Sequence, residues 1–167
     1  MDDVTFAQAF IRELELETTS TRKCLERIPV ELYGYKPHEK SMALGYLSVL
    51  TAEIPLWIKY MIAEPSIDLA TFKHLHPTST QEVVDHFDEN VKVTKEALQQ
   101  VKNGDLDATF ELKVNGNVVF SGTKRINIES TINHMVHHRG QLSVYMRLND
   151  IAVPSIYGPS ADDKTFG

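Results

Sequence analysis

Three histidines lie within five positions of one another in the stretch NHMVHHRGQL. On a helix, His134 and His138 project from one face, about 6 Å apart, because they are four residues apart. Two imidazoles in this arrangement can bind one divalent metal ion, as helical His-x-x-x-His sites do. His137 is rotated from His138 by about 100° and faces a different neighbour. The spacing therefore predicts a metal-type face at His134 and His138.

A histidine pair at this spacing also occurs without metal, as polar residues of a solvated or partly buried helix face. Two ligands fall short of the three or four that a stable site needs. Spacing alone leaves both interpretations open, and a metal site requires a further donor from elsewhere in the chain.

The histidines need a helix to position them. Apolar residues recur with the helical period over residues 128–149, which predicts a helix there with Asn127 as its N-cap. Two earlier segments show the same period. Residues 4–28 form a helix that ends before Pro29, and residues 42–62 form a second helix that starts after Ser41. The hydroxyl of Ser41 is expected to cap it.

The third helix covers residues 80–102. Ser79 and Glu82 form a capping-box pattern at its start, and Asn103-Gly104 stops it. Residues 64–78 are expected to be a long loop with at most short turns.

One β signal follows the third helix. Residues 110–114 alternate apolar and polar side chains, as a strand does, and Asn115-Gly116 favours a type I′ turn after it. Residues 118–120 are expected to form the second strand of this hairpin. Residues 151–167 show no helical period and form an irregular tail. The sequence predicts one all-α domain, residues 1–167, with four helices and a small β-hairpin between the third and fourth.

Three stretches, KPHEKSMALGYLSVLTAEIPLW, NHMVHHRGQLSVYMRL and VPSIYGPSAD, resemble the DinB/YfiT-like family of bacterial metalloenzymes. The resemblance covers nearly the whole chain in the right order. It implies a four-helix bundle of the up-down-down-up type, commonly a homodimer, in which three histidines hold nickel or zinc. Two of them fall on His134 and His138. The family name records that a member is DNA damage-inducible, which concerns regulation and not DNA binding.

The third family histidine, in the second helix, falls on Leu50 when the Ala-Glu-Ile-Pro stretches are aligned, and leucine has no lone pair to offer. Glu53 lies one turn away, and His74 or His76 can reach in from the loop as substitute ligands. The preferred interpretation makes Glu53 a supporting partner or a cap. Tyr46, one turn before Leu50, is expected to line the same pocket.

Other polar and aromatic residues have mainly structural interpretations. We expect Arg139 to pair with Asp162 or Asp163 of the tail. Gln141 is expected to be a polar bundle residue, and Trp57 a core or dimer contact.

Bulk composition narrows the function classes. A net charge of -6 and a pI near 5.6 argue against a general affinity for nucleic acid, since phosphate binding needs a basic surface. Cys24 is the only cysteine, which favours a reducing compartment and a buried, inert thiol. The N-terminal stretch lacks a signal-peptide pattern and no apolar run would span a bilayer. We expect a cytoplasmic protein without a membrane partner.

Two function classes remain. The resemblance implies a thiol-dependent transferase or hydrolase-like metalloenzyme, in which a divalent metal activates a low-molecular-weight thiol. The alternative is a non-catalytic, metal-free small-molecule-binding or stress-response module with its pocket between helices. In a metal-free pocket, His134 and His138 act as hydrogen-bonding groups or as general acid and base.

Overall fold

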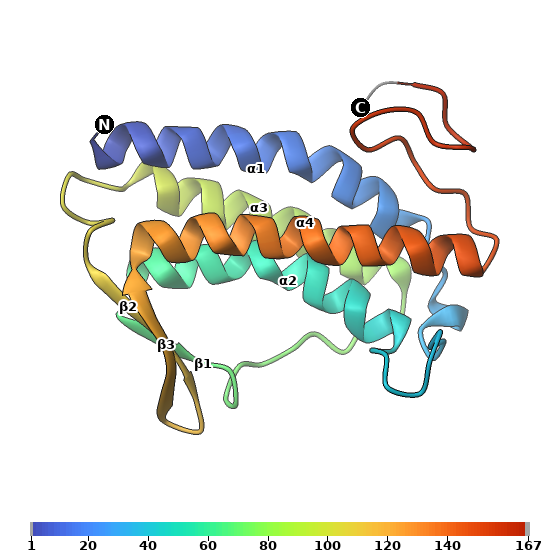
Figure 1. The fold of residues 1–167 in the computed structure, drawn as a ribbon, viewed down its shortest axis with the longest axis horizontal. Helices are drawn as coiled ribbons and strands as arrows, with labels where there is room; N and C mark the ends of the chain where they lie inside the picture. Colours follow the sequence, from blue (N-terminus) through green and yellow to red (C-terminus); the bar gives the residue numbers. More distant parts are fainter. Residues whose placement is uncertain (1, 166–167) are drawn as a thin grey trace.

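Four long helices lie lengthwise beside one another in the computed structural model, which describes residues 2–165 (Figure 1). They are α1 (Asp3–Glu26), α2 (Leu44–Ala63), α3 (Thr80–Gln99) and α4 (Lys124–Leu148). A short 3-10 helix, η1 (Val30–Leu32), follows α1. One small sheet contains the strands β1 (Ser66–Asp68), β2 (Thr109–Val114) and β3 (Asn117–Thr123). The fold is largely helical, as expected, and β1 extends the expected hairpin to a three-stranded sheet.

Side chains cap the starts of three helices. Asp2, Ser79 and Thr123 each accept a hydrogen bond from a backbone N–H in the first turn, at 2.8, 3.3 and 3.4 Å. These bonds satisfy donors that a helix start leaves free. The expected cap at Ser79 is confirmed. Asn127 is not the cap of α4, because Thr123 at the end of β3 starts that helix one turn earlier.

Backbone carbonyls, and not Ser41, satisfy the start of α2. The N–H of Leu44 donates to the carbonyl of Tyr35 and the N–H of Gly45 to that of Tyr33, both at 2.9 Å. Ala43 is the N-cap residue and makes no side-chain capping bond. A Cβ at position 45 would lie 2.6 Å from the Cβ of Tyr33, so only glycine allows this approach. The expected Ser41 cap was wrong, because the segment before α2 supplies the acceptors itself.

The sheet contains the expected hairpin and one unexpected strand. Asn115 and Gly116 have φ values of 50° and 78°, which confirms the type I′ turn. β1 pairs in parallel with β2, so the expectation of a loop over residues 64–78 was wrong there. The carboxylate of Asp68 accepts from the N–H groups of Asn115 and Gly116, at 3.1 and 2.7 Å. A three-residue strand such as β1 is too short to show an alternation of apolar and polar side chains in the sequence. It forms a strand because it pairs with the edge of β2.

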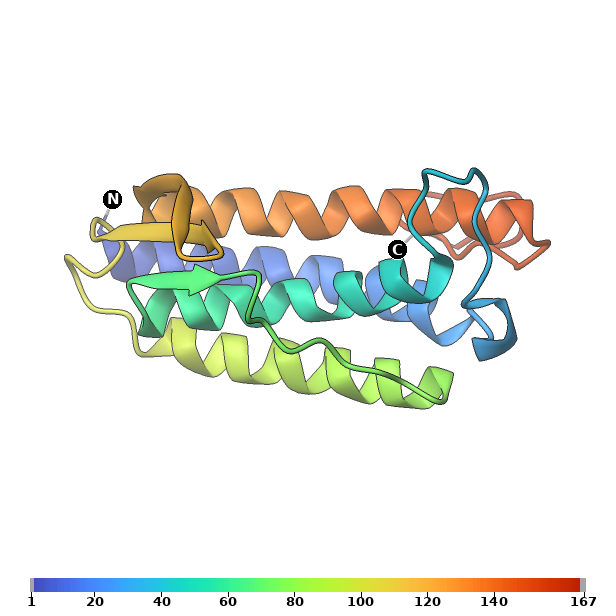
Figure 2. The same cartoon turned by 90° about the horizontal axis from the view of Figure 1, so that it is seen from below.

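The core divides into two clusters along the bundle. One contains Leu14, Leu47 and Phe87, and the other contains Ile58 and Phe110 near the sheet. The sheet lies at one end of the bundle beside α2 and α4, and the chain between β1 and α3 runs back along it (Figures 1 and 2). No helix within the described residues is long and apolar enough to cross a membrane.

Hydrogen bonds from α3 hold the middle of α2. The amide of Asn90 donates to the carbonyl of Ala52 at 2.9 Å, and the hydroxyl of Thr94 donates to the carbonyl of Pro55 at 2.6 Å. Both bonds are buried. They fix the stretch of α2 from which Glu53 and Trp57 project.

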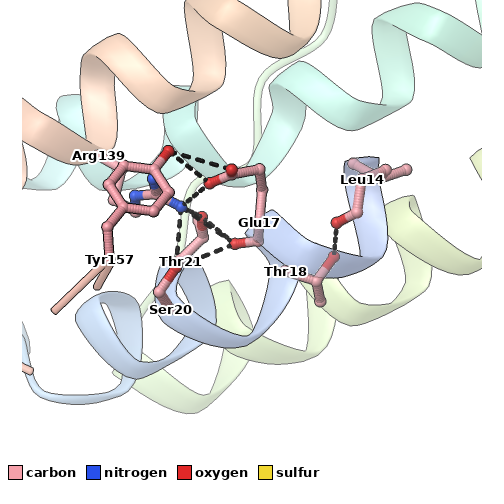
Figure 3. Close-up of polar contacts among 7 residues, drawn as sticks. All are labelled: Leu14, Glu17, Thr18, Ser20, Thr21, Arg139 and Tyr157. Carbon is pink, nitrogen blue, oxygen red and sulfur yellow. Dashed lines mark hydrogen bonds and ion pairs between the residues drawn. The ribbon is translucent and has the colours of Figure 1, made fainter. Parts of the chain in front are cut away.

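Arg139 joins α4 to α1 and to the tail (Figure 3). Its side chain is 1% exposed, and one terminal nitrogen donates to the carboxylate of Glu17 and to the hydroxyl of Ser20. The other terminal nitrogen donates to the hydroxyl of Tyr157, at 2.7 Å. The expected pair of Arg139 with a tail aspartate was wrong, because position 139 faces α1.

The tail aspartates have other partners. Arg147, two turns after Arg139, pairs with Asp162 at 2.5 Å. Asp163 accepts from the N–H groups of Ser155 and Thr165, and bonds from Thr165 are the main cause that lowers its pKa to about 2. No regular element is present in residues 149–165, as expected for the tail.

Candidate functional site

His134 and His138 face each other on α4. Their Nε2 atoms are 2.7 Å apart and their ring centroids 4.5 Å apart. His138 is 6% exposed, and the ring of His137 lies edge-on to it at 5.1 Å. The four-residue spacing places both imidazoles over the same turn of the helix, as their sequence positions predict.

The hydrogen bonds define where the protons lie. The Nδ1 of His138 is 2.7 Å from Oε1 of Gln141, an oxygen that only accepts, so this nitrogen carries a proton. In the neutral ring the Nε2 of His138 is then bare. Because two bare nitrogens would repel each other at 2.7 Å, the proton between the rings belongs to Nε2 of His134. The Nδ1 of His134 is therefore a free acceptor.

Burial keeps the pair neutral. Desolvation, reinforced by the charges of His138 and His137, lowers the pKa of His134 to about 4. The pKa of His138 is also lowered, mainly by desolvation, although its bond to Gln141 opposes the shift. Near neutral pH both rings are uncharged, and their lone pairs are available as acceptors.

A cavity of about 350 Å³ opens beside His134. It lies between α2, α4 and the sheet, and no charged side chain lines it. Most of its wall is apolar and includes the side chains of Trp57, Met61, Ile67, Phe110, Leu112 and Phe120. The ring centroid of Trp57 lies 5.6 Å from that of His134, so the aromatic wall continues directly into the histidine pair.

Four polar side chains of the cavity wall come from α4, and Trp57 on α2 adds a buried indole N–H that has no hydrogen-bond partner among the described residues. The four are Asn127, Ser130, Thr131 and His134, and their spacing of three, four and seven residues puts them on one face of the helix. Seven residues span about 10 Å along the axis. The cavity therefore has an apolar side from α2 and the sheet, and a polar stripe along α4.

The side chains of this site do not supply enough ligands for a complete metal site. His134 and His138 supply two nitrogens, whereas protein zinc sites use three or four protein ligands. Within residues 2–165, no group of three or more His, Cys, Asp or Glu side chains is arranged to hold a metal ion. Leu50, at the position of the third histidine of the resembling family, belongs to the apolar core cluster. The side chains present therefore do not fit a resident divalent ion.

Glu53 takes part in a different cluster. Its side chain is 1% exposed, with Oε2 2.6 Å from Nδ1 of His74 and Oε1 accepting from the N–H of Leu75 at 2.7 Å. The Nε2 of His86, on α3, lies 3.7 Å from Oε1. Glu53 and His74 thus bind each other, and the carboxylate anchors the segment between β1 and α3 to the bundle.

The remaining expected pocket residues lie away from the cavity beside His134. Tyr46 is 48% exposed and, with His74 and His76, lines a separate cavity of about 280 Å³. Leu50 and Glu53 line neither of these two cavities. The structure brings His134 and His138 together, but it places Tyr46 and Glu53 with residues of the loop.

Sequence reasoning missed three features of the site. The polar stripe of α4 was visible as the helical spacing of Asn127, Ser130, Thr131 and His134. His86 follows the apolar pair Val83-Val84, which indicates a position near the buried face of its helix. The place of Trp57 in a cavity wall has no such signal, because it depends on strands distant in the sequence.

Comparisons with known proteins agree on the family. A family model described as the DinB family matches residues 1–165. The uncharacterized protein YrdA of Bacillus subtilis (strain 168) is 26% identical over 165 residues, which cover 92% of this chain and 89% of that protein.

Two solved structures share the fold. A DinB-like protein from Bacillus cereus ATCC 10987 has a TM-score of 0.66 at 24% identity, and covers 90% of this chain and 97% of that chain. The DinB-like protein YjoA of Bacillus subtilis has a TM-score of 0.65 at 19% identity, with coverage of 85% and 92%.

Proposed function

The chain belongs to the DinB family, and we propose that it binds a neutral small molecule in the cavity beside His134, without a resident metal ion. The observation that carries this proposal is the junction of the apolar cavity with a neutral histidine pair. A volume of about 350 Å³ lies in the range of small-molecule sites, which combine apolar walls with a few polar groups. The histidine pair is the polar end of this site.

His134 acts here as a hydrogen-bonding group. A base with a pKa of about 4 removes protons poorly at neutral pH, because an efficient general base has a pKa near the working pH. The neutral ring keeps a lone pair on Nδ1 without adding charge to the cavity. The geometry therefore supports binding more than general base catalysis.

We propose in addition that the four helices run up-down-down-up, with the chain between β1 and α3 returning along the bundle. This segment, together with β1, contributes Ile67 and Leu69 to the cavity wall. Phe72 lies against Trp57 with a centroid distance of 6.1 Å. The segment is thus part of the site, and its anchor at Glu53 supports the cavity wall.

The competing function is that of a metalloenzyme in which a divalent metal ion activates a low-molecular-weight thiol. The close approach of the two Nε2 atoms favours this function. Elemental analysis after incubation with zinc or nickel separates the two. We expect far less than about one ion per chain in the native protein, and about one in Leu50→His, which adds a third donor. A stoichiometric ion in the native protein that is lost in His134→Ala would overturn the metal-free proposal.

Binding is tested with N-phenyl-1-naphthylamine, a neutral probe whose fluorescence rises in apolar surroundings. Ser130→Trp places an indole at the cavity wall and is expected to abolish most of the rise. The matched control is Ser143→Trp, on the same helix but outside the cavity. Equal fluorescence in all three proteins would show that the probe binds elsewhere.

A further inference from the structure

The polar stripe of α4 has a surplus of hydrogen-bond acceptors. Asn127 donates its Nδ2 to the carbonyl of Thr123 at 2.9 Å, and no described residue donates to its Oδ1. The hydroxyl proton of Thr131 is used on the carbonyl of Asn127 at 2.8 Å, which leaves its oxygen as an acceptor. His134 adds the lone pair of Nδ1. Thr131 and His134 therefore only accept, whereas Asn127 offers its Oδ1 as an acceptor and keeps the second hydrogen of its Nδ2 as a donor.

Ser130 is exposed, and its hydroxyl, which has no partner among the described residues, can both donate and accept. The cavity has no lysine or arginine to neutralise an anion, and no carboxylate to neutralise a cation. Burying an unpaired charge in such surroundings is costly.

From this donor and acceptor balance we propose that the ligand is an uncharged, largely apolar molecule that carries hydroxyl or N–H donors along one edge. The inference rests on the proposed binding function and specifies its ligand class. The donor edge lies along Asn127, Ser130, Thr131 and His134, and the apolar face packs on Trp57 and the hairpin. A rigid molecule about 10 Å long matches the stripe.

A matched set of biphenyls tests the proposal by isothermal titration calorimetry of the full chain near neutral pH. 4-Phenylphenol has a donor, 4-methoxybiphenyl has the same shape without one, and biphenyl-4-carboxylate and 4-phenylbenzylammonium carry charges. We expect the phenol to bind about tenfold more tightly than the ether, because acceptors left unpaired in a buried site are costly. The charged compounds should bind more weakly than the phenol.

Variants assign the effect to the stripe. Ser130→Ala should weaken binding of the phenol about threefold and leave the ether unchanged. His134→Phe should reduce the preference for the phenol over the ether, since it removes one of the acceptors and keeps a ring. Ser143→Ala, on α4 outside the cavity, should bind both compounds as the native protein does.

The outcomes separate the two proposals. Equal binding of phenol and ether, or tightest binding of the carboxylate or the ammonium compound, would overturn the donor-bearing ligand class and leave the binding function standing. If no biphenyl binds and the naphthylamine probe does not bind either, both proposals fail.

Discussion

Burial decides what His134 can do. The spacing of His134 and His138 was sufficient to predict that their rings meet, because four residues return a helix to the same face. Spacing does not show that Gln141 orients His138, nor that desolvation lowers the pKa of His134 to about 4. Those properties depend on the side chains packed around the pair. Whether the pair binds a metal ion stays a prediction.

The pKa of His134 makes stability depend on pH. Its ordinary value of 6.5 applies to the unfolded chain, so between pH 6.5 and about pH 4 the unfolded chain binds more protons than the folded one. This contribution to stability is fully present above pH 6.5 and is lost as the pH falls. In His134→Gln, the free energy of unfolding measured with urea should fall less between about pH 7 and pH 5 than in the native protein.

The control for this prediction is His38→Gln, in an exposed loop. It should keep the pH dependence of the native protein. A native-like slope in His134→Gln would contradict the assignment of the buried, neutral histidine.

At the scale of elements, the helices were more predictable than their ends and connections. The four helical periods and the Asn115-Gly116 turn identified their elements, since these signals are local. Ser41 and Asn127 failed as caps because Tyr33 and Tyr35 supply carbonyls to one helix, and a preceding strand supplies Thr123 to the other. β1 depends on pairing with residues 45 positions later, which a three-residue segment cannot reveal.

The bond of Glu53 to the loop gives a prediction at this scale. Glu53→Gln replaces a charged acceptor of His74 and Leu75 by a neutral one, and we expect the free energy of unfolding to fall by about 1–3 kcal/mol. Hydrogen exchange at the amide of Leu75 should become faster. Binding of the naphthylamine probe should weaken as well, because the anchored segment forms part of the cavity wall.

Glu64→Gln is the matched control, because Glu64 is exposed at the end of α2. It should leave stability and exchange nearly unchanged. Native-like protection of Leu75 in Glu53→Gln would rule out the anchoring role.

At the scale of the whole molecule, a single buried arginine holds distant parts of the chain together. Arg139 bonds to Glu17 and Ser20 of α1 and to Tyr157 of the tail (Figure 3). Sequence reasoning recognised that Arg139 forms an ion pair but chose the wrong partner, because the rotation of α4 against α1 is a tertiary property. The homodimer implied by the family resemblance stays a prediction.

Removing this arginine should destabilise the whole fold. Arg139→Met leaves the carboxylate of Glu17 without its buried partner, and the free energy of unfolding should fall by about 3–5 kcal/mol. Urea denaturation measures this loss. Arg147→Met breaks the more exposed pair with Asp162 and should cost about 1 kcal/mol or less. Equal losses in the two variants would show that burial of Arg139 contributes little.

The most direct test of the account is nitrogen-15 NMR of the histidine rings near neutral pH, with and without 4-phenylphenol. We predict a protonated Nδ1 in His138, a protonated Nε2 in His134, and a shift of the bare Nδ1 of His134 when the phenol is added. This pattern is that of a neutral hydrogen-bonding pair at a ligand cavity. Bare Nε2 atoms in both rings, or a His134 resonance that the phenol leaves unmoved, would contradict it.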